Sequence, residues 1–276
     1  MVGRGKFRRP VVVGAFEGWN DAADAATAVI EHLAASYPTD LIFELDSEEY
    51  YDYQIVRPRV ANSDDGREIV WPTTSISVAH LPARDVVLVS GPEPNMHWQR
   101  FCTSLVSAFR STEPELIILL GAMLTDSPHS RPLPVTASTG DQALARALGL
   151  ESSNYEGPTG ITGVLADACR RAGLREISLW ASVPHYVASP PNPKATLALL
   201  SRVEDLLDTA LELDDLPELA RAWTRGVDEL AAEDSEISEY IESLEAQQDE
   251  NNLPQASGDS IAAEFERYLR RRGQAD

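Results

Sequence analysis

Cysteine is scarce in this sequence. The 276 residues include only Cys102 and Cys169, which lie far apart within stretches of helical periodicity. No Cys-x-x-Cys pair and no Cys/His spacing is present, so neither a disulfide framework nor a structural zinc site is indicated. We therefore predict that both thiols are small buried side chains, and we expect no bound metal.

Long hydrophobic runs are also lacking. A membrane-spanning helix needs roughly 18 or more consecutive apolar residues, and no stretch approaches that length. The basic start at residues 4–9 is followed only by the run from Val11 to Val13, which is too short for the core of a signal peptide. These features predict a cytoplasmic protein that does not interact with membranes.

Positive charge is in short supply. Lysine and arginine total 23 against 44 aspartate and glutamate residues, which gives a formal net charge of −21. Such a surface repels phosphate backbones, so we expect no nucleic-acid partner. The excess is concentrated in residues 214–250, where thirteen acidic residues meet two arginines. An acidic composition of this kind favours solubility and does not by itself indicate a partner.

The common catalytic motifs are missing as well. No serine lies in a Gly-x-Ser-x-Gly elbow, which argues against an α/β-hydrolase. The glycine-rich turn at residues 157–160 has neither the lysine and spacing of a P-loop nor the pattern of a dinucleotide fingerprint. We therefore expect no cofactor.

What the sequence does contain is an alternation of apolar runs and amphipathic stretches from residue 10 to about 212. Strands are predicted over residues 11–16, 41–45, 86–89, 115–120 and 177–183. The segments 67–71 and 75–81 are predicted to pair with each other as a side hairpin. This pattern indicates an α/β fold, namely a three-layer α/β/α sandwich around a mostly parallel mixed sheet.

Capping residues precede several of the predicted helices. Asn20, Asn95 and Asn192 are expected to cap the helices that follow them, and Pro193 suits a first helical position. Asp215 with Glu218 fits a capping box.

The chain changes character at Asp214, and residues 214–276 are predicted to form an acidic helical appendage. Apolar stripes recur over 216–230, 237–244 and 261–269, with a polar, linker-like break at 247–257. Short helices are marginal alone in water, so the stripes need a surface to bury against. We expect side chains of the first stripe to pack on the α/β body or on a neighbouring subunit, namely Trp223, Val227 and Leu230.

Chemistry-bearing side chains gather in loops that follow predicted strands. The apolar run 115–120 leads into a loop with an acid, a histidine and an arginine, at the position where open α/β sheets bind ligands. Together with loops elsewhere it could form a pocket. The candidate ligand contacts are Glu17, Trp19, Asp21, Arg131 and Thr159, and the candidate catalytic residues are Asp126, His129 and His185.

Each candidate also has a structural interpretation. Asp126 with His129 could be an acid–base pair, or both could stiffen a proline-rich loop. His185 could be a second base or a half-buried hydrogen-bonded histidine. Thr159 lies in a turn that could hold an anion at a helix start, although the signal is weak. Trp19 could bind a ligand or cover the core.

Several motifs in register resemble the proteasome assembly chaperone 2 family, in its actinobacterial-type branch. They span residues 11 to about 205, and the sequence at 262–271 also resembles that branch. The matching pieces are Gly14-Ala15-Phe16-Glu17-Gly18-Trp19-Asn20-Asp21-Ala22, Gly91-Pro92-Glu93-Pro94-Asn95, Gly121-Ala122-Met123-Leu124, Pro128-His129-Ser130-Arg131-Pro132, Tyr155-Glu156-Gly157-Pro158-Thr159-Gly160, Leu179-Trp180-Ala181, Val183-Pro184-His185-Tyr186 and Pro190-Pro191-Asn192-Pro193-Lys194-Ala195-Thr196-Leu197.

The resemblance implies a phosphorylase/hydrolase-like sandwich and a non-enzymatic interaction or assembly protein that forms homo-oligomers. Relatives that dock on proteasome rings use a C-terminal hydrophobic-Tyr-X tail, which residues 273–276 lack, so ring docking is not expected. A different interpretation stays open: a small-molecule-binding hydrolase or transferase for a nucleoside-like ligand.

Overall fold

The fold is organised around the buried strand β1, Val11–Glu17, whose first six residues are fully enclosed. The computed structural model describes residues 7–63, 66–150 and 155–252. β1 pairs in parallel with β6, Asp85–Pro92, on one side and with β7, Leu116–Thr125, on the other. A strand segment that is covered on both faces must be apolar, as residues 11–16 are.

Seven strands form the main sheet in the order β2-β5-β6-β1-β7-β9-β8. The remaining members are β2, Thr39–Glu44, β5, Ser75–His80, β8, Val135–Ser138, and β9, Glu176–Pro184. β7 and β9 pair in parallel, whereas β5 and β8 run antiparallel to their neighbours. The sheet is therefore mixed, with a parallel centre.

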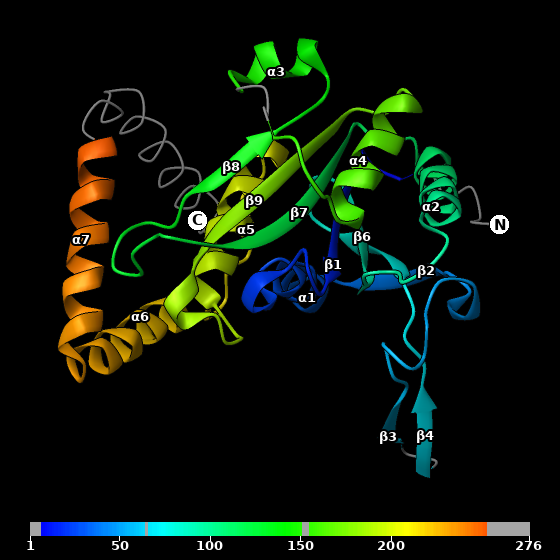
Figure 1. Cartoon of the computed structure of the whole chain (residues 1–276). Helices are drawn as coiled ribbons and strands as arrows, with labels where there is room; N and C mark the ends of the chain where they lie inside the picture. Colours follow the sequence, from blue (N-terminus) through cyan, green and yellow to red (C-terminus); the bar gives the residue numbers. More distant parts are fainter. Residues whose placement is uncertain (1–6, 64–65, 151–154, 253–276) are drawn as a thin grey trace.

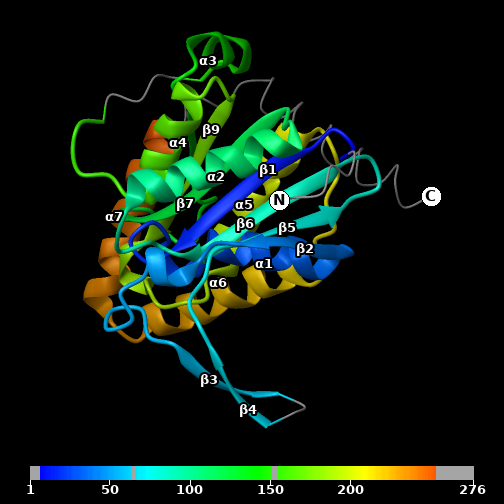
Figure 2. The same ribbon diagram turned by 90° about the vertical axis from the view of Figure 1, so that its right-hand side faces the viewer.

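Helices cover both faces of the sheet and enclose two separate cores (Figures 1 and 2). One face packs against α1, Thr27–Ser36, and α5, Pro193–Leu207; the other packs against α2, Trp98–Thr112, and α4, Ile161–Arg171. A short helix, α3, Gln142–Leu148, follows β8.

Cys102 and Cys169 lie buried in the α2/α4 core, as predicted, and burial raises the pKa of each thiol to about 12. Within the described ranges, no helix is both long and apolar enough to cross a membrane.

The predicted pairing of 67–71 with 75–81 is wrong. β4, Gly66–Val70, pairs instead with β3, Arg59–Ser63, in a separate two-stranded hairpin, while β5 joins the main sheet between β2 and β6. Apolar side chains of β5 such as Ile76 and Val78 belong to the α2/α4 core, and that burial fixes the strand in the sheet. The hairpin projects from the body in both views (Figures 1 and 2).

Neither Asn95 nor Asp215 caps the helix that was predicted to follow it. Asn95 Oδ1 accepts the backbone N–H of Asp52 at 2.9 Å, which ties the loop before α2 to a distant segment. Asp215 makes no side-chain capping bond to α6, so the capping box with Glu218 does not form. The cap at Asn192 is confirmed, because its Oδ1 accepts the Ala195 N–H at 3.0 Å.

The predicted appendage contains two helices, α6, Leu216–Ala232, and α7, Ser235–Asn252. Val227, Ile241 and Leu244 are buried, in line with the stripes, whereas Leu230 is 64% exposed and does not pack on the body. Its packing on a neighbouring subunit stays a prediction. The helix α7 continues through 247–252, the first part of the predicted polar break. The rest of that break and the stripe at 261–269 lie outside the described residues.

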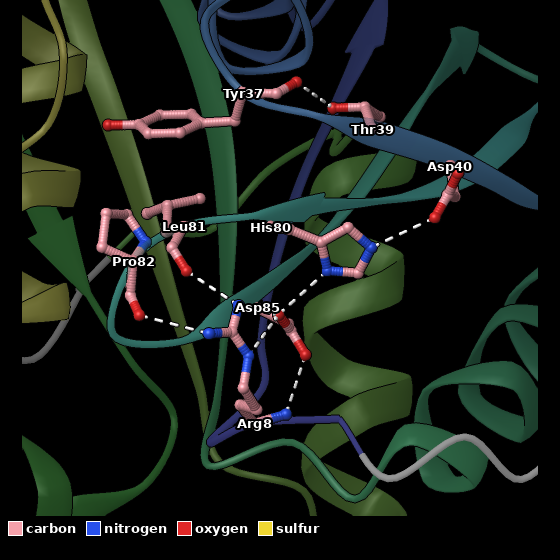
Figure 3. Close-up of polar contacts among 8 residues, drawn as sticks. All are labelled: Arg8, Tyr37, Thr39, Asp40, His80, Leu81, Pro82 and Asp85. Atoms are coloured by element: carbon pink, nitrogen blue, oxygen red, sulfur yellow. Dashed lines mark hydrogen bonds and ion pairs between the residues drawn. The ribbon is translucent and has the colours of Figure 1, made fainter.

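An ionic cluster fastens the segment before β1 to the sheet (Figure 3). Asp85 Oδ1 accepts the Arg8 guanidinium at 2.7 Å, and Asp85 Oδ2 accepts the Arg8 backbone N–H at 2.8 Å. His80 Nδ1 lies 3.0 Å from the same carboxylate and its Nε2 lies 3.2 Å from Asp40. Burial alone would raise the pKa of Asp85, but the hydrogen bonds from Arg8 and His80 hold it below its ordinary value. The bonds to Asp85 and Asp40 raise the pKa of His80.

We expect Asp85→Asn to lower the free energy of unfolding by about 1–3 kcal/mol, because Arg8 and His80 lose a charged acceptor. The Asp85 contribution is present above the unfolded pKa of 3.8 and is lost as pH falls through the lower folded pKa. The His80 contribution is present below its unfolded pKa of 6.5 and is lost as pH rises through the raised folded pKa. Urea denaturation should therefore show a larger loss at pH 5.5 than at pH 9.

The exposed Asp40 provides the matched control, since its side chain is 82% exposed. Asp40→Asn should change stability by no more than about 0.5 kcal/mol. Equal losses in the two variants would contradict the central role of Asp85.

Candidate functional site

An open cleft of about 1340 Å³ lies on the α4 side of β7, β9 and β8. It exists because the helical layer on this face stops short. The buried core beneath α2 and α4 contains no residue of β8 or β9. Ser178 and Trp180 of β9 therefore face the cleft, while Ile177, Leu179 and Ala181 face the opposite core.

Apolar and aromatic groups make up much of the wall. Trp180 lies against Gly121, where a Cβ would come within 2.6 Å of the indole ring, so only glycine leaves room for the tryptophan. At the mouth, Trp19, Met123 and Leu124 are 66%, 44% and 51% exposed. Exposed large apolar groups that cluster in this way are typical of a binding surface.

Polar groups lie along β8 and deeper in the cleft. Thr136 and Ser178 line it, together with Glu176, which is almost fully buried. Glu176 Oε1 accepts the Gly140 N–H at 2.8 Å and the Thr139 hydroxyl at 3.2 Å. Burial raises the pKa of Glu176, and these hydrogen bonds offset part of that rise. The carboxylate thus orders the turn before α3 and is already engaged.

The glycine-rich turn before α4 binds the carboxylate of Glu93 rather than leaving its N–H groups open to an external anion. Glu93 Oε1 accepts the Ile161 N–H at 2.8 Å and the Asn20 side-chain amide at 2.7 Å. The first turn of α4 is thus capped by a carboxylate from the loop after β6. A Cβ on Gly160 would lie 2.1 Å from Asn20 Oδ1, so glycine is required here. Thr159, next to it, lines the cleft.

In the loop after β1, Asp21 caps the following helix and Trp19 lines the cleft. Asn20 was predicted to cap the next helix, but the buried Asp21 does so instead. Its carboxylate accepts the N–H groups of Ala26 at 2.6 Å and Thr27 at 2.9 Å. Burial raises the pKa of Asp21, against the effect of these bonds. Burial also raises the pKa of Glu17. Arg59 opposes this rise, and nearby acidic side chains add to it. Only Trp19 of this group enters the cleft.

The loop between β7 and β8 is anchored by the C-terminal helices. His129 is fully buried: its Nδ1 lies 2.8 Å from the Tyr186 hydroxyl and its Nε2 lies 3.0 Å from Asp228 of α6. The Tyr186 oxygen also accepts the His129 backbone N–H at 2.7 Å, so Tyr186 bonds to this histidine twice. The Trp223 ring packs edge-on against the His129 imidazole, with the two ring centroids 6.3 Å apart.

The predicted pairing of Asp126 with His129 does not form. Asp126 Oδ1 instead lies 3.3 Å from His185 Nδ1 and accepts the Tyr240 hydroxyl of α7 at 3.2 Å. The two histidines therefore have different carboxylate partners. None of these residues lines the cleft.

Arg131 and its neighbours hold α7 against the same loop. The Arg131 guanidinium donates to both oxygens of Asp249, at 3.0 and 2.8 Å, and this bond raises the pKa of Arg131. Ser130 bonds to Glu245, and Gln248 donates to the Pro132 carbonyl at 3.0 Å. The candidate acid, base and cation of this loop are thus engaged in binding α6 and α7.

Desolvation also acts on Tyr186 and Lys194, which lie beside His129. Burial raises its pKa to about 12, and burial lowers the pKa of Lys194, whose ammonium group donates to the His129 carbonyl. A neutral, buried tyrosine that bonds twice to one histidine is suited to holding a loop in place. Over the described residues, no cluster of three or more His, Cys, Asp or Glu side chains could hold a metal ion.

Sequence reasoning missed most of the partners of the candidate residues. Glu93 and Trp180 lie inside motifs that stand out in the sequence, and Tyr186 directly follows His185. Asp228 gives no such signal, because 99 residues separate it from His129. Its position within an acidic amphipathic helix indicates a solvated face rather than a contact.

Comparisons with known proteins agree with this architecture. The profile of the PAC2 family matches residues 15–231. A PAC2 family protein from Streptomyces avermitilis is 52% identical over 84% of this chain and 99% of its own, with a TM-score of 0.80. A Mycobacterium tuberculosis proteasome-assembly chaperone homologue, Rv2125, is 50% identical over the same shares, with a TM-score of 0.77.

More distant structures share the fold alone. The archaeal proteasome activator PbaB from Pyrococcus furiosus is 16% identical over 83% of this chain and 96% of its own, with a TM-score of 0.65. Among curated proteins, no sequence matches. The α/β fold and the extent of the profile match define the class, and the chain belongs to the PAC2 family.

Gly160→Ala should lower the free energy of unfolding by about 1–3 kcal/mol, because the new methyl group would collide with Asn20 Oδ1. Gly226→Ala in α6 is the matched control, since nothing lies within 4 Å of its added Cβ. That change should be neutral or raise stability by up to about 1 kcal/mol. Urea denaturation of both variants checks the contrast, and a neutral Gly160→Ala would refute the packing argument.

Tyr186→Phe should destabilise the protein by about 1–3 kcal/mol, because the His129 backbone N–H and Nδ1 both lose a buried partner. Tyr240→Phe removes only an exposed bond to Asp126 and should cost no more than about 0.5 kcal/mol. Hydrogen exchange in α6 should rise in the first variant and not in the second. Unchanged exchange in both would mean that His129 does not hold the helix.

Proposed function

We propose that this protein is a non-enzymatic interaction or assembly factor that acts as a homo-oligomer. The observation that carries the proposal is the pair of exposed apolar surfaces on an otherwise very acidic chain. One is the cleft mouth around Trp19, Met123 and Leu124; the other is the β3–β4 hairpin, with Val60 and Ile69 more than half exposed. Surfaces of this kind are typical of protein contacts.

The state of the candidate catalytic residues supports the same proposal. Asp126, His129 and Arg131 are bonded to side chains of α6 and α7, and His185 is paired with Asp126. A general base needs access to a substrate proton, and His129 is only 1% exposed. Its geometry favours a role in anchoring the helices.

The names of relatives point to proteasome-associated assembly. The mycobacterial relative is described as a proteasome-assembly chaperone homologue and the archaeal one as a proteasome activator. We extend this only to the class of function: contact with other protein subunits during assembly. The phosphorylase/hydrolase-like assignment of the sandwich is likewise kept as a proposal, supported by the mixed sheet with helices on both faces.

A small-molecule-binding hydrolase or transferase remains the second proposal, because a cleft of about 1340 Å³ contains Thr136, Thr159 and Ser178. Of the eight candidate residues, Trp19 and Thr159 line it. A thermal-shift panel of nucleosides and nucleotides tests this function, since a ligand at 100 times its Kd stabilises the fold by about 2.7 kcal/mol. We expect no shift. A shift that Thr159→Ala abolishes would favour the second proposal.

For the preferred function, we expect light scattering coupled to size exclusion to give a mass that is a multiple of 30.2 kDa. The mass should fall on dilution if the contact is reversible, and affinity purification from native lysate should recover further protein subunits. A 30.2 kDa monomer at all concentrations, recovered alone, would contradict the proposal.

A further inference from the structure

The β3–β4 hairpin and its flanks, residues 55–63 and 66–71, form an arm that belongs to no larger sheet and contacts the body at its base, where Val56 packs on the α2/α4 core and residues 68–71 share a recess with residues 44–47. β3 and β4 pair only with each other among the described strands, and their side chains are exposed or at most half-buried. Both views show the hairpin projecting away from the sheet (Figures 1 and 2). A lone two-stranded hairpin is marginally stable in water and requires a further packing surface.

The arm exposes apolar side chains that such a surface would cover. Val60 and Ile69 lie opposite each other across the hairpin and are 55% and 51% exposed. Ile55, Val70 and Trp71 are exposed as well, and Trp71 stacks on Tyr53 at 4.8 Å near the base. The surface to be buried therefore extends along the arm from its base.

Charge favours another copy of this chain as the partner. The chain carries −21, so two bodies repel each other, whereas the segment 55–71 holds three arginines and three acids and is neutral. The arm is therefore a part of the molecule that can approach an acidic neighbour without like-charge repulsion.

The cleft supplies the complementary surface. Its volume of about 1340 Å³ exceeds the roughly 300–1,000 Å³ of small-molecule pockets, and Trp19, Met123 and Leu124 are exposed at its mouth. The arm and helix α3, which borders the cleft, lie at opposite ends of the molecule in both views (Figures 1 and 2). The arm points away from α3 and leaves that side of its own cleft open to the arm of a second copy.

We propose that the β3–β4 arm of one copy packs Val60 and Ile69 against Met123 and Leu124 at the cleft mouth of a second copy. This inference rests on the proposed homo-oligomer and assigns its interface. Arm and cleft are different surfaces, so the contact is heterologous or occurs twice in a symmetric pair.

Two double variants test the two halves. V60D with I69D removes the apolar arm, and M123D with L124D removes the apolar mouth; all four positions are largely exposed, so the fold is retained. L41D with F43D changes two exposed apolar residues on the edge strand β2 and serves as the matched control. Far-UV circular dichroism and thermal melts verify folding in each case.

Each of the two interface variants alone should be monomeric by light scattering, with self-association weakened at least tenfold. The control should match the wild type. An equimolar mixture of the arm variant and the cleft variant should regain a dimer, because one chain keeps an intact cleft and the other an intact arm.

A crosslink gives an independent readout. V60C on one chain and M123C on another should form a mixed disulfide under mild oxidation, and neither should crosslink with L41C. The native Cys102 and Cys169 are buried thiols and contribute no background.

The outcomes separate the inference from the proposed function. An oligomeric wild type whose mass is unchanged in both double variants overturns the interface while the homo-oligomer stands. Dissociation by the arm variant alone, without recovery on mixing, means that arms pair with arms and overturns the role of the cleft. A monomeric wild type overturns both.

Discussion

The burial of β1 between two parallel neighbours and two helical layers is the constraint on which the rest of the molecule depends. Because the strand is paired with β6 along its whole length and with β7 over residues 11–14, its end is fixed in space, and the next residues inherit that position. Asn20 meets Glu93 and Gly160, Asp21 caps the following helix, and Trp19 is left at the surface. Three adjacent residues thus join two loops, start a helix and form the mouth of the cleft.

The two faces of the sheet are covered unequally, and this difference creates the cleft. On one face, α5 packs against β9; on the other, the core beneath α2 and α4 contains no residue of β8 or β9. A sheet face without a full helical cover keeps apolar groups in contact with solvent, and Trp180 above Gly121 is half-buried there. The cleft is thus a consequence of layer geometry rather than of any single loop.

The C-terminal helices show how reactive side chains can be used for structure. A histidine, an arginine and a serine in one loop resemble catalytic equipment, yet each is matched by a residue of α6 or α7. Acidic helices beside this loop provide carboxylates for its donors. Some of the acidic side chains in residues 214–250 therefore serve to hold this loop, because they accept its hydrogen bonds.

The amino-acid sequence by itself determined the strands that are buried on both faces, since a continuous apolar run such as 116–120 must be removed from water. It also determined the cap at Asn192, which acts within four residues. Tertiary structure alone decided the pairing of β5 with β2 and the partners of His129 and Asp126. Those contacts join residues that lie far apart in the sequence, and a carboxylate or imidazole bonds equally well to any donor or acceptor that the fold brings near. Local pattern specifies burial, whereas the pairing of polar groups depends on which distant segments the layers bring together.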